Sequence, residues 1–289
     1  MVDTTLRLFQ QGGFLCHECF PLGEENVTLD NIRSKRTKVG NIDINYYFGG
    51  QGDPVIVLHG GASGSEAWMK TVSELTKNFA VYLPDLPGFG HSQSIDGDYY
   101  IPELVEFVDK FSHHLGVESF HLVGHSLGGG VALNYVLKFP GKVKKLVLIS
   151  SMCLGREISW WIRLLSHPAL IRSIGRAAID IFRGVKWVAG KLFTGLKLVL
   201  PFSKASILIG SSVTTLKEQT MVLVDRLSEI MVPTLVVWGA RDPIVPVRQA
   251  YAAAQLIPCC QLKVFEGCGH SVYRQRIQEF SQLVTGFLS

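Results

Sequence analysis

The residues at 124–129, Gly-His-Ser-Leu-Gly-Gly, place a serine where a nucleophile could act. They directly follow the apolar run 120–123 and precede a second apolar stretch, so Ser126 lies at a strand-to-helix junction. A serine in so tight a turn takes a strained backbone conformation that pushes its hydroxyl outward, and the close approach of strand and helix leaves no room for side chains at Gly124 and Gly128. The pattern predicts a nucleophilic serine, although an ordinary glycine-rich turn also fits it.

A serine hydroxyl is a weak nucleophile at neutral pH, so it needs a histidine base and a carboxylate that orients the histidine. His270 follows the apolar run 261–265 through a short glycine-containing loop. Asp242 follows the run 233–238, in a loop that two prolines enforce. The carboxyl ends of parallel strands meet at one edge of a sheet. We therefore expect Ser126, Asp242 and His270 to converge there.

A fourth loop could hold the negative charge that develops when a serine attacks a carbonyl group. The residues 59–64, His-Gly-Gly-Ala-Ser-Gly, follow the apolar run 55–58. The flexible backbone of this loop can direct the N–H of Gly61, or alternatively that of Ala62, at an oxyanion, and the N–H of Leu127 is the expected second donor.

Short β-like runs alternate with helical patterns from 37 to 150, which indicates a mostly parallel sheet flanked by helices, an α/β fold. The expected strands are a leading hairpin at 39–48 and runs at 55–58, 80–83, 120–123, 143–149, 233–238 and 261–265, and the expected helices are 65–77, 102–115, 127–139, 247–256 and 272–288. The alternation lapses at 153–220 and then resumes, so this segment is an insertion into a core formed by 36–152 and 221–289. Residues 1–35 show little periodicity and are expected to form an N-terminal arm.

Five motifs in this order resemble those of the α/β-hydrolase superfamily, in its lidded, esterase- and lipase-like branch. They are the loop 59–64, the segment 85–92 (Asp-Leu-Pro-Gly-Phe-Gly-His-Ser), the Ser126 turn, Asp242 and His270. The resemblance covers about 37–150 and 231–289. It implies a serine hydrolase with a Ser126–His270–Asp242 triad, an acyl-enzyme intermediate and no cofactor, and it implies that 153–220 is a helical cap over the substrate pocket.

The sequence offers two other interpretations of the acid. Asp242 could merely cap the helix expected near Val247, and some family members carry the acid after the preceding strand instead. That position here reads Ile-Ser-Ser-Met at 149–152, without a carboxylate. Asp242 is therefore the predicted acid. His59, His125 and Asp85 are expected to shape the backbone rather than take part in the chemistry.

The resemblance favours a small-molecule acyl substrate, a carboxylic ester. Relatives that act on halides or epoxides use an aspartate at the position of Ser126, which disfavours those reactions. An alternative is a carbon–carbon bond hydrolase of ring-cleavage dienoic acids, but such enzymes have a tryptophan shortly after the catalytic histidine, where Ser-Val-Tyr stands at 271–273. A non-enzymatic binding protein on the same fold is disfavoured because every catalytic position is filled.

The inserted segment is basic and aromatic. Nine Lys or Arg residues stand between Arg156 and Lys204 against two acidic residues. We expect Trp160, Trp161 and Trp187 to contribute to substrate binding and the cations to be solvated. Two hypotheses compete with this one: the cap lies on an anionic membrane surface and admits lipid esters, or its arginines bind an acidic substrate.

Composition narrows the classes further. The chain has 289 residues, 47% hydrophobic and 18% charged, which is typical of a folded protein with a large core. The net charge of +4 is too small to indicate nucleic-acid binding. Without an apolar run long enough for a signal peptide or a membrane span, the chain is expected to be cytoplasmic, with its six cysteines reduced. Cys16 and Cys19 have the spacing of half a metal site, but no second pair follows and no metal is expected.

Overall fold

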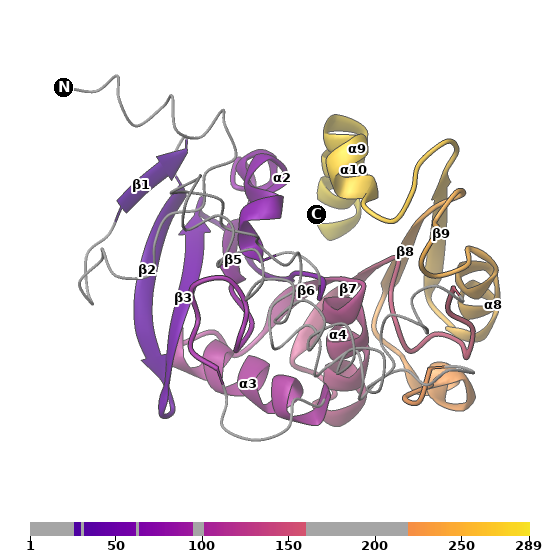
Figure 1. The fold of residues 1–289 in the computed structure, drawn as a ribbon, viewed down its shortest axis with the longest axis horizontal. Coiled ribbons are helices and arrows are strands. Elements are labelled where there is room, and N and C mark those ends of the chain that lie inside the picture. Colours follow the sequence, from indigo (N-terminus) through magenta and orange to yellow (C-terminus); the bar gives the residue numbers. More distant parts are fainter. Residues whose placement is uncertain (1–25, 30–31, 62–63, 95–100, 160–218) are drawn as a thin grey trace, which may run out of the picture.

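A mixed β-sheet with helices on both faces forms the body of the protein (Figure 1). The computed structural model describes residues 26–29, 32–61, 64–94, 101–159 and 219–289. The strands are β1 (Asn26–Leu29), β2 (Ile32–Val39), β3 (Ile42–Gly49), β4 (Pro54–Leu58), β5 (Ala80–Pro84), β6 (Phe120–His125), β7 (Val143–Ile149), β8 (Thr234–Gly239) and β9 (Cys260–Phe265). The helices are η1 (Ser65–Trp68), α2 (Met69–Leu75), α3 (Ile101–His114), α4 (Leu127–Lys138), η2 (Val224–Glu229), α8 (Arg248–Leu256), α9 (Val272–Gln275) and α10 (Ile277–Leu288).

The described strands form one sheet in the order β1-β2-β3-β5-β4-β6-β7-β8-β9. Strands β4 to β9 run parallel to one another. Strands β1, β2 and β3 pair in antiparallel fashion, and β3 joins β5 in the same way. The predicted α/β class with a mostly parallel central sheet is confirmed. Because β4 to β9 point the same way, the loops that leave their carboxyl ends lie at one edge of the sheet.

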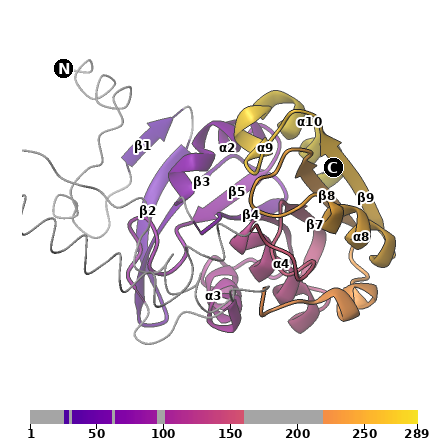
Figure 2. The same cartoon turned by 45° about the vertical axis from the view of Figure 1, so that its right-hand side comes forward.

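Each face of the sheet has its own apolar core, because successive strand residues point to opposite faces. Ile56 and Leu58 of β4 belong to a buried cluster that includes α3, α4 and α8. Val55 and Val57 of the same strand belong to a second cluster, with α2, α9 and α10. Figures 1 and 2 show α3 and α4 on one side of the sheet and α2, α9 and α10 on the other. The sheet is thus buried on both faces, which makes it a rigid base for the loops at its edge.

The leading hairpin is longer than the sequence predicts. The sequence predicts a hairpin at 39–48, whereas β2 and β3 pair from Ile32 opposite Gly49 to Val39 opposite Ile42. Strand β2 reads Ile-Arg-Ser-Lys-Arg-Thr-Lys-Val, and most of its side chains are exposed or half-buried. The six residues between Ile32 and Val39 are all polar or charged, and they hide the two-residue period in the sequence. Strand β1 and the first part of β2 lie within the segment 1–35.

The five expected helices are present, two of them with changes, and the short helix η2 is an addition that the sequence does not predict. The helix expected at 65–77 begins with a 3-10 turn, η1, before α2. The closing helix expected at 272–288 is divided into α9 and α10. Arg276 between them has φ −134° and ψ 55°, which are not helical angles. This break turns the chain away from the sheet edge before α10 packs against α2.

Some predictions concern residues outside those the structure describes. Cys16 and Cys19 lie there, as does most of the inserted segment 153–220, and the proposed domain boundaries stay predictions. In the described part of the chain, no helix has the length and apolar character needed to cross a membrane. The same part contains no cluster of three or more His, Cys, Asp or Glu residues that could hold a metal ion.

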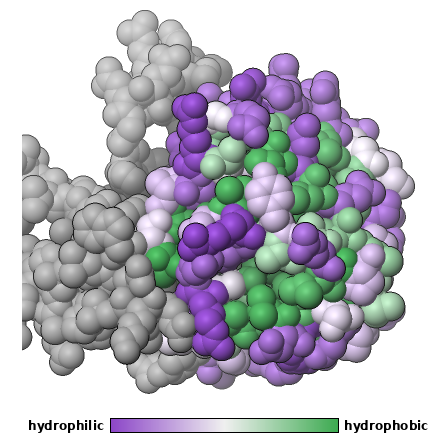
Figure 3. Space-filling view, turned by 90° about the vertical axis from the view of Figure 1, so that its right-hand side faces the viewer, coloured by the Kyte–Doolittle hydropathy of each residue, from purple (hydrophilic) through white to green (hydrophobic). Residues whose placement is uncertain are grey.

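Figure 3 shows the face around β9 and α8, where hydrophobic residues lie among hydrophilic ones. Tyr251 and Leu256 of α8 are 50% and 42% exposed.

Candidate active site

The turn between β6 and α4 holds Ser126 in a strained backbone conformation. Ser126 has φ 53° and ψ −113°, a rare combination for a residue with a side chain. Its N–H donates to the carbonyl of Ile149 at 2.9 Å, and its carbonyl accepts from the N–H of Met152 at 3.0 Å. Strain of this kind persists only where the surrounding structure holds it. Strand β7 and the residues after it therefore clamp the turn that carries the candidate nucleophile.

Two glycines make this turn possible. A methyl group built on Gly124 would collide with the carbonyl oxygen of Gly128 and would lie 2.7 Å from Cα of Gly129. One built on Gly128 would collide with the carbonyl oxygen of Leu58 and would lie 2.6 Å from that of His59. The sequence prediction that side chains are excluded at Gly124 and Gly128 agrees with this packing. Helix α4 starts against the end of β4 because neither glycine has a side chain.

The predicted acid and base are hydrogen-bonded. His270 Nδ1 lies 2.8 Å from Asp242 Oδ2, and the two side chains are 13% and 0% exposed. A carboxylate only accepts hydrogen bonds, so Nδ1 carries the proton and Nε2 is left to accept another. The second oxygen, Asp242 Oδ1, accepts from the N–H groups of Ile244 at 2.8 Å and Val245 at 3.1 Å. Asp242 does not cap α8, whose first turn has no side-chain cap.

The acid and base loops are also joined through their main chains. The N–H of Ala240 donates to the carbonyl of Phe265 at 3.0 Å, and that of Arg241 donates to Cys268 at 2.9 Å. On the other side, the N–H of Gly269 donates to Gln275 Oε1 at 2.8 Å. These hydrogen bonds therefore fix the position of the His270 loop relative to β8 and Asp242.

His125, the residue before Ser126, connects the nucleophile turn with the base loop. Its Nε2 lies 2.9 Å from the carbonyl oxygen of His270, and the two imidazole rings are 4.7 Å apart between centroids. Burial lowers the pKa of His125 well below its ordinary value of 6.5, with the nearby His270 as a second cause. Ser126, His270 and Asp242 are thus brought to one edge of the sheet, as the sequence predicts.

The loop after β4 is oriented by His59. The N–H of Leu86 donates to His59 Nε2 at 2.9 Å, so the ring proton is on Nδ1, which donates to the carbonyl of Gly60 at 2.8 Å. The peptide group is planar and trans, so the Gly60 carbonyl and the Gly61 N–H point in opposite directions. By holding the carbonyl, His59 sets the direction of the N–H. The sequence shows this histidine beside two glycines, but not where its ring points.

Gly61 and Leu127, the residues predicted to donate to the oxyanion, lie close to each other. A methyl group built on Gly61 would be 3.5 Å from Cδ2 of Leu127, and one built on Gly60 would be 3.3 Å from Cβ of Ser126. Within the described residues, neither the Gly61 nor the Leu127 N–H donates to a protein acceptor. Their role as oxyanion donors stays a prediction. Ala62, the alternative donor, lies outside the described residues.

The carboxylate of Asp85 anchors the loop 85–92. It is buried and accepts from the N–H of Ser65 at 2.9 Å, the amide of Asn45 at 3.0 Å and the N–H of His91 at 3.0 Å. These donors come from three separate parts of the chain. The structural role expected for Asp85 agrees with these contacts.

The two ends of the inserted segment meet at Gln219. Its N–H donates to the carbonyl of Arg156 at 2.8 Å, and its side chain accepts from Cys153 N–H and donates to the carbonyl of Glu157, each at 3.0 Å. The chain thus leaves and re-enters the core at neighbouring points. The predicted substrate-binding residues Trp160, Trp161 and Trp187 lie outside the described residues.

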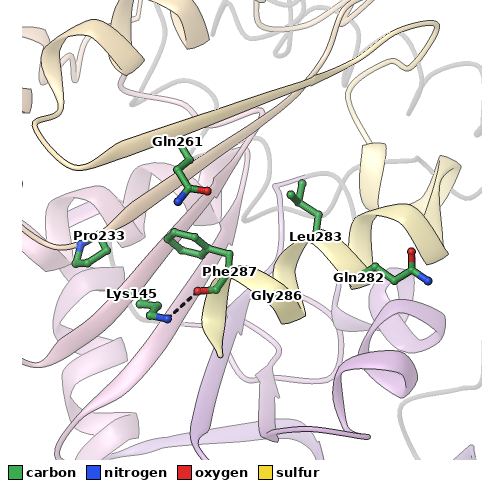
Figure 4. Close-up of a pocket in the computed structure, with 7 residues that line it drawn as sticks. All are labelled: Lys145, Pro233, Gln261, Gln282, Leu283, Gly286 and Phe287. Carbon is green, nitrogen blue, oxygen red and sulfur yellow. Dashed lines mark hydrogen bonds between the residues drawn. The ribbon is translucent and has the colours of Figure 1, made fainter.

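A cavity of about 450 Å³ lies at the opposite edge of the sheet (Figure 4). Its lining includes Lys145 at the beginning of β7, Gln261 at the beginning of β9, and Leu283 and Phe287 of α10. Lys145 Nζ donates to the carbonyl of Phe287 at 2.8 Å. These positions are at the amino ends of the strands, so this cavity is not the acyl pocket that Ser126 would require.

Comparison with known proteins agrees with the fold. The family model of the alpha/beta hydrolase fold matches residues 53–174 and 191–276, so the chain belongs to this family of hydrolases. A monoacylglycerol lipase of Xenopus laevis is 30% identical over 81% of this chain and 75% of its own length. A 2-hydroxy-6-oxononadienedioate hydrolase of Comamonas testosteroni is 27% identical over 92% and 98%. Among solved structures, an esterase of Thermogutta terrifontis has a TM-score of 0.68 and 25% identity, covering 88% of this chain and 97% of its own.

Proposed function

We propose that this protein hydrolyses a carboxylic ester through Ser126, His270 and Asp242. The observation that carries the proposal is the pairing of a strained serine with a histidine whose Nδ1 is held by a buried carboxylate. This arrangement leaves Nε2 of His270 as the base for the serine hydroxyl. The esterase and the lipase among the similar proteins support ester chemistry.

The proposed reaction has two halves. His270 Nε2 takes the proton of Ser126, whose Oγ bonds to the ester carbonyl carbon while the Gly61 and Leu127 N–H groups stabilise the oxyanion. The carbonyl re-forms, the carbon–oxygen bond to the alcohol breaks, and His270 gives its proton to the leaving alkoxide. Water then attacks the acyl-enzyme with His270 again as base, which releases the carboxylic acid and restores Ser126. Asp242 holds the His270 ring in place throughout.

Labelling with a fluorophosphonate tests the nucleophile directly. The wild type is expected to be labelled and Ser126→Ala is not. Ser281→Ala is a matched control, because Ser281 is buried in α10 and its hydroxyl has no hydrogen-bond partner among the described residues; it should be labelled like the wild type. Labelling that survives Ser126→Ala would refute the proposal.

Carbon–carbon bond hydrolysis is the second candidate, supported by the Comamonas testosteroni relative. Against it, Tyr273 after the base is fully buried and stacks on Trp68 at 3.8 Å between ring centroids, so it faces the core. Turnover of p-nitrophenyl esters of increasing chain length, measured beside a ring-cleavage dienoate, decides between the two. Faster turnover of the dienoate than of every ester would replace the ester assignment.

A lipid ester at a membrane surface is the remaining substrate hypothesis, supported by the relative named a monoacylglycerol lipase and by the basic inserted segment. It predicts flotation of the protein with anionic vesicles, and absence of flotation would remove it. The cytoplasmic location and the lack of a nucleic-acid partner stay predictions of the sequence.

A further inference from the structure

His125 is a buried residue that lies between the loop of His270 and the loop after β4. It precedes Ser126 at the end of β6 and is 3% exposed. Its Nε2 is 2.9 Å from the carbonyl oxygen of His270, and a methyl group built on Gly60 would be 2.8 Å from its Nδ1. The His125 ring therefore fills the space between the main chain of His270 and Gly60 in the loop after β4.

The protonation of this ring follows from its partner. A carbonyl oxygen can only accept a hydrogen bond, so Nε2 of His125 carries a proton and donates a hydrogen bond to the carbonyl oxygen of His270. Since burial keeps the ring neutral, Nδ1 is unprotonated, and it has no hydrogen-bond partner among the described residues. His125 is thus a neutral donor with one defined tautomer.

Aromatic neighbours hold the plane of this ring. The centroid of Tyr273 is 4.9 Å away at an angle of 63°, and that of Trp68 is 6.3 Å away at 65°. Trp68 and Tyr273 themselves stack at 3.8 Å with 7° between their planes. The Nε2–H group therefore has little freedom to turn away from the carbonyl of His270.

We infer that His125 is a positioning residue that sets the distance between the base and the nucleophile. Asp242 holds the imidazole of His270 but does not hold its main chain. The His125 Nε2–H bond ties that main chain to the end of β6, directly before Ser126. The inference rests on the proposed hydrolysis, in which His270 takes the proton of Ser126.

Variants of His125 separate the hydrogen bond from the packing. His125→Phe keeps an aromatic ring and removes the donor, and it should lower kcat about 10- to 100-fold with little change in KM, because small misplacements of catalytic groups have effects of this size. His125→Gln places an amide donor at a similar reach and should recover most of kcat. His125→Asn has the same chemistry with a shorter side chain and should not. The Gln and Asn pair tests the inference even if the Phe variant does not fold.

His121 provides the matched control. It lies at the other end of β6 and is 2% exposed, and strand alternation places it on the same face as His125. His121→Phe should change the melting temperature while leaving kcat and KM within about twofold, because loss of packing alone does not move the base. Equal losses of kcat in His125→Gln and His125→Phe, or a folded His125→Phe with kcat within twofold of the wild type, would overturn the inference.

A measurement without substrate keeps the inference separate from the proposed function. NMR of the histidine ring nitrogens in the wild type should show His125 as the Nε2–H tautomer, unchanged between about pH 6 and 9. An Nδ1–H tautomer would overturn the inference even in an active enzyme. If fluorophosphonate labels neither the wild type nor any variant, the proposed function fails, whatever tautomer the spectrum shows.

Discussion

At the scale of single residues, the site depends on polar side chains that orient other groups. Asp242 orients the ring of His270, His59 orients the Gly60–Gly61 peptide, and His125 holds the main chain of His270. None of the three needs to touch the substrate. In the proposed reaction only a few atoms take part, and neighbouring residues determine how accurately those atoms are placed.

Replacing the acid tests this dependence. Asp242→Asn should lower kcat by about 10³- to 10⁴-fold while the protein stays folded, because an amide at this position favours the wrong tautomer of His270. Asp225→Asn, an exposed change at the start of η2, should leave kcat unchanged. Steady-state kinetics on one ester measures both, and a loss below tenfold in Asp242→Asn would argue against its assigned role.

The sequence predicts Ser126, Asp242 and His270 because each follows an apolar run, and runs in a parallel sheet end at a common edge. It does not predict the hydrogen bonds of His59 and His125. The direction of each ring depends on which main-chain atoms other strands place beside it, and those neighbours are far away in the chain.

At the scale of elements, the start of α4 is a junction at which a helix and a strand approach closely. The helix begins against the end of β4, and contact between their main chains leaves no volume at Gly128. Other helices approach the sheet through side chains, as α10 does with Phe280 and Val284. A glycine is therefore required for packing at the start of α4, whereas a glycine in α10 only lowers the helix propensity.

Two glycine substitutions test this difference between α4 and α10. Gly128→Ala should lower the free energy of unfolding by several kcal/mol, because the new methyl group forces strand and helix apart. Gly286→Ala, in α10 with no atom within 4 Å of the new methyl, should raise it by about 1 kcal/mol through helix propensity. Denaturant unfolding measures both changes, and a stabilising Gly128→Ala would contradict the close approach of α4 and β4.

The strands and helices around the site follow from hydrophobic periodicity, since both sheet faces are buried. The first strands do not. Strand β2 lies near the margin of the sheet with charged, half-exposed side chains, so pairing with β3 decides its conformation. The sequence does not predict the break at Arg276 either, because no glycine or proline is present there.

At the scale of the whole molecule, buried histidines link stability to pH. The pKa of His125 is lowered by burial and by neighbouring His270, His59 and Arg274, and the pKa of His121 is lowered by burial, partly opposed by Asp53. Unfolding restores ordinary values near 6.5. Below that pH the unfolded chain binds more protons than the folded one, so stability is present above pH 6.5 and falls on acidification.

Melting temperatures of the wild type and His125→Gln between pH 8 and pH 5 should show this. Each histidine that stays neutral can lower the free energy of unfolding by up to about 1.4 kcal/mol per pH unit below its unfolded pKa. The variant should therefore lose less stability on acidification than the wild type. Carboxylates contribute to both proteins, so the difference between the curves reports His125, and parallel curves would show that it is not neutral in the folded state.

The hydrogen bonds of Gln219 have a consequence for how this protein can diversify. Because Cys153, Arg156 and Glu157 meet Gln219 directly, the chain needs almost no span to close the core without the segment between them. An insertion with adjoining ends behaves as an interchangeable cassette. The sequence predicts that this cassette covers the substrate pocket. Under the proposed function, its mutation, lengthening or exchange is expected to change substrate selection, while the core that carries Ser126, Asp242 and His270 keeps its fold.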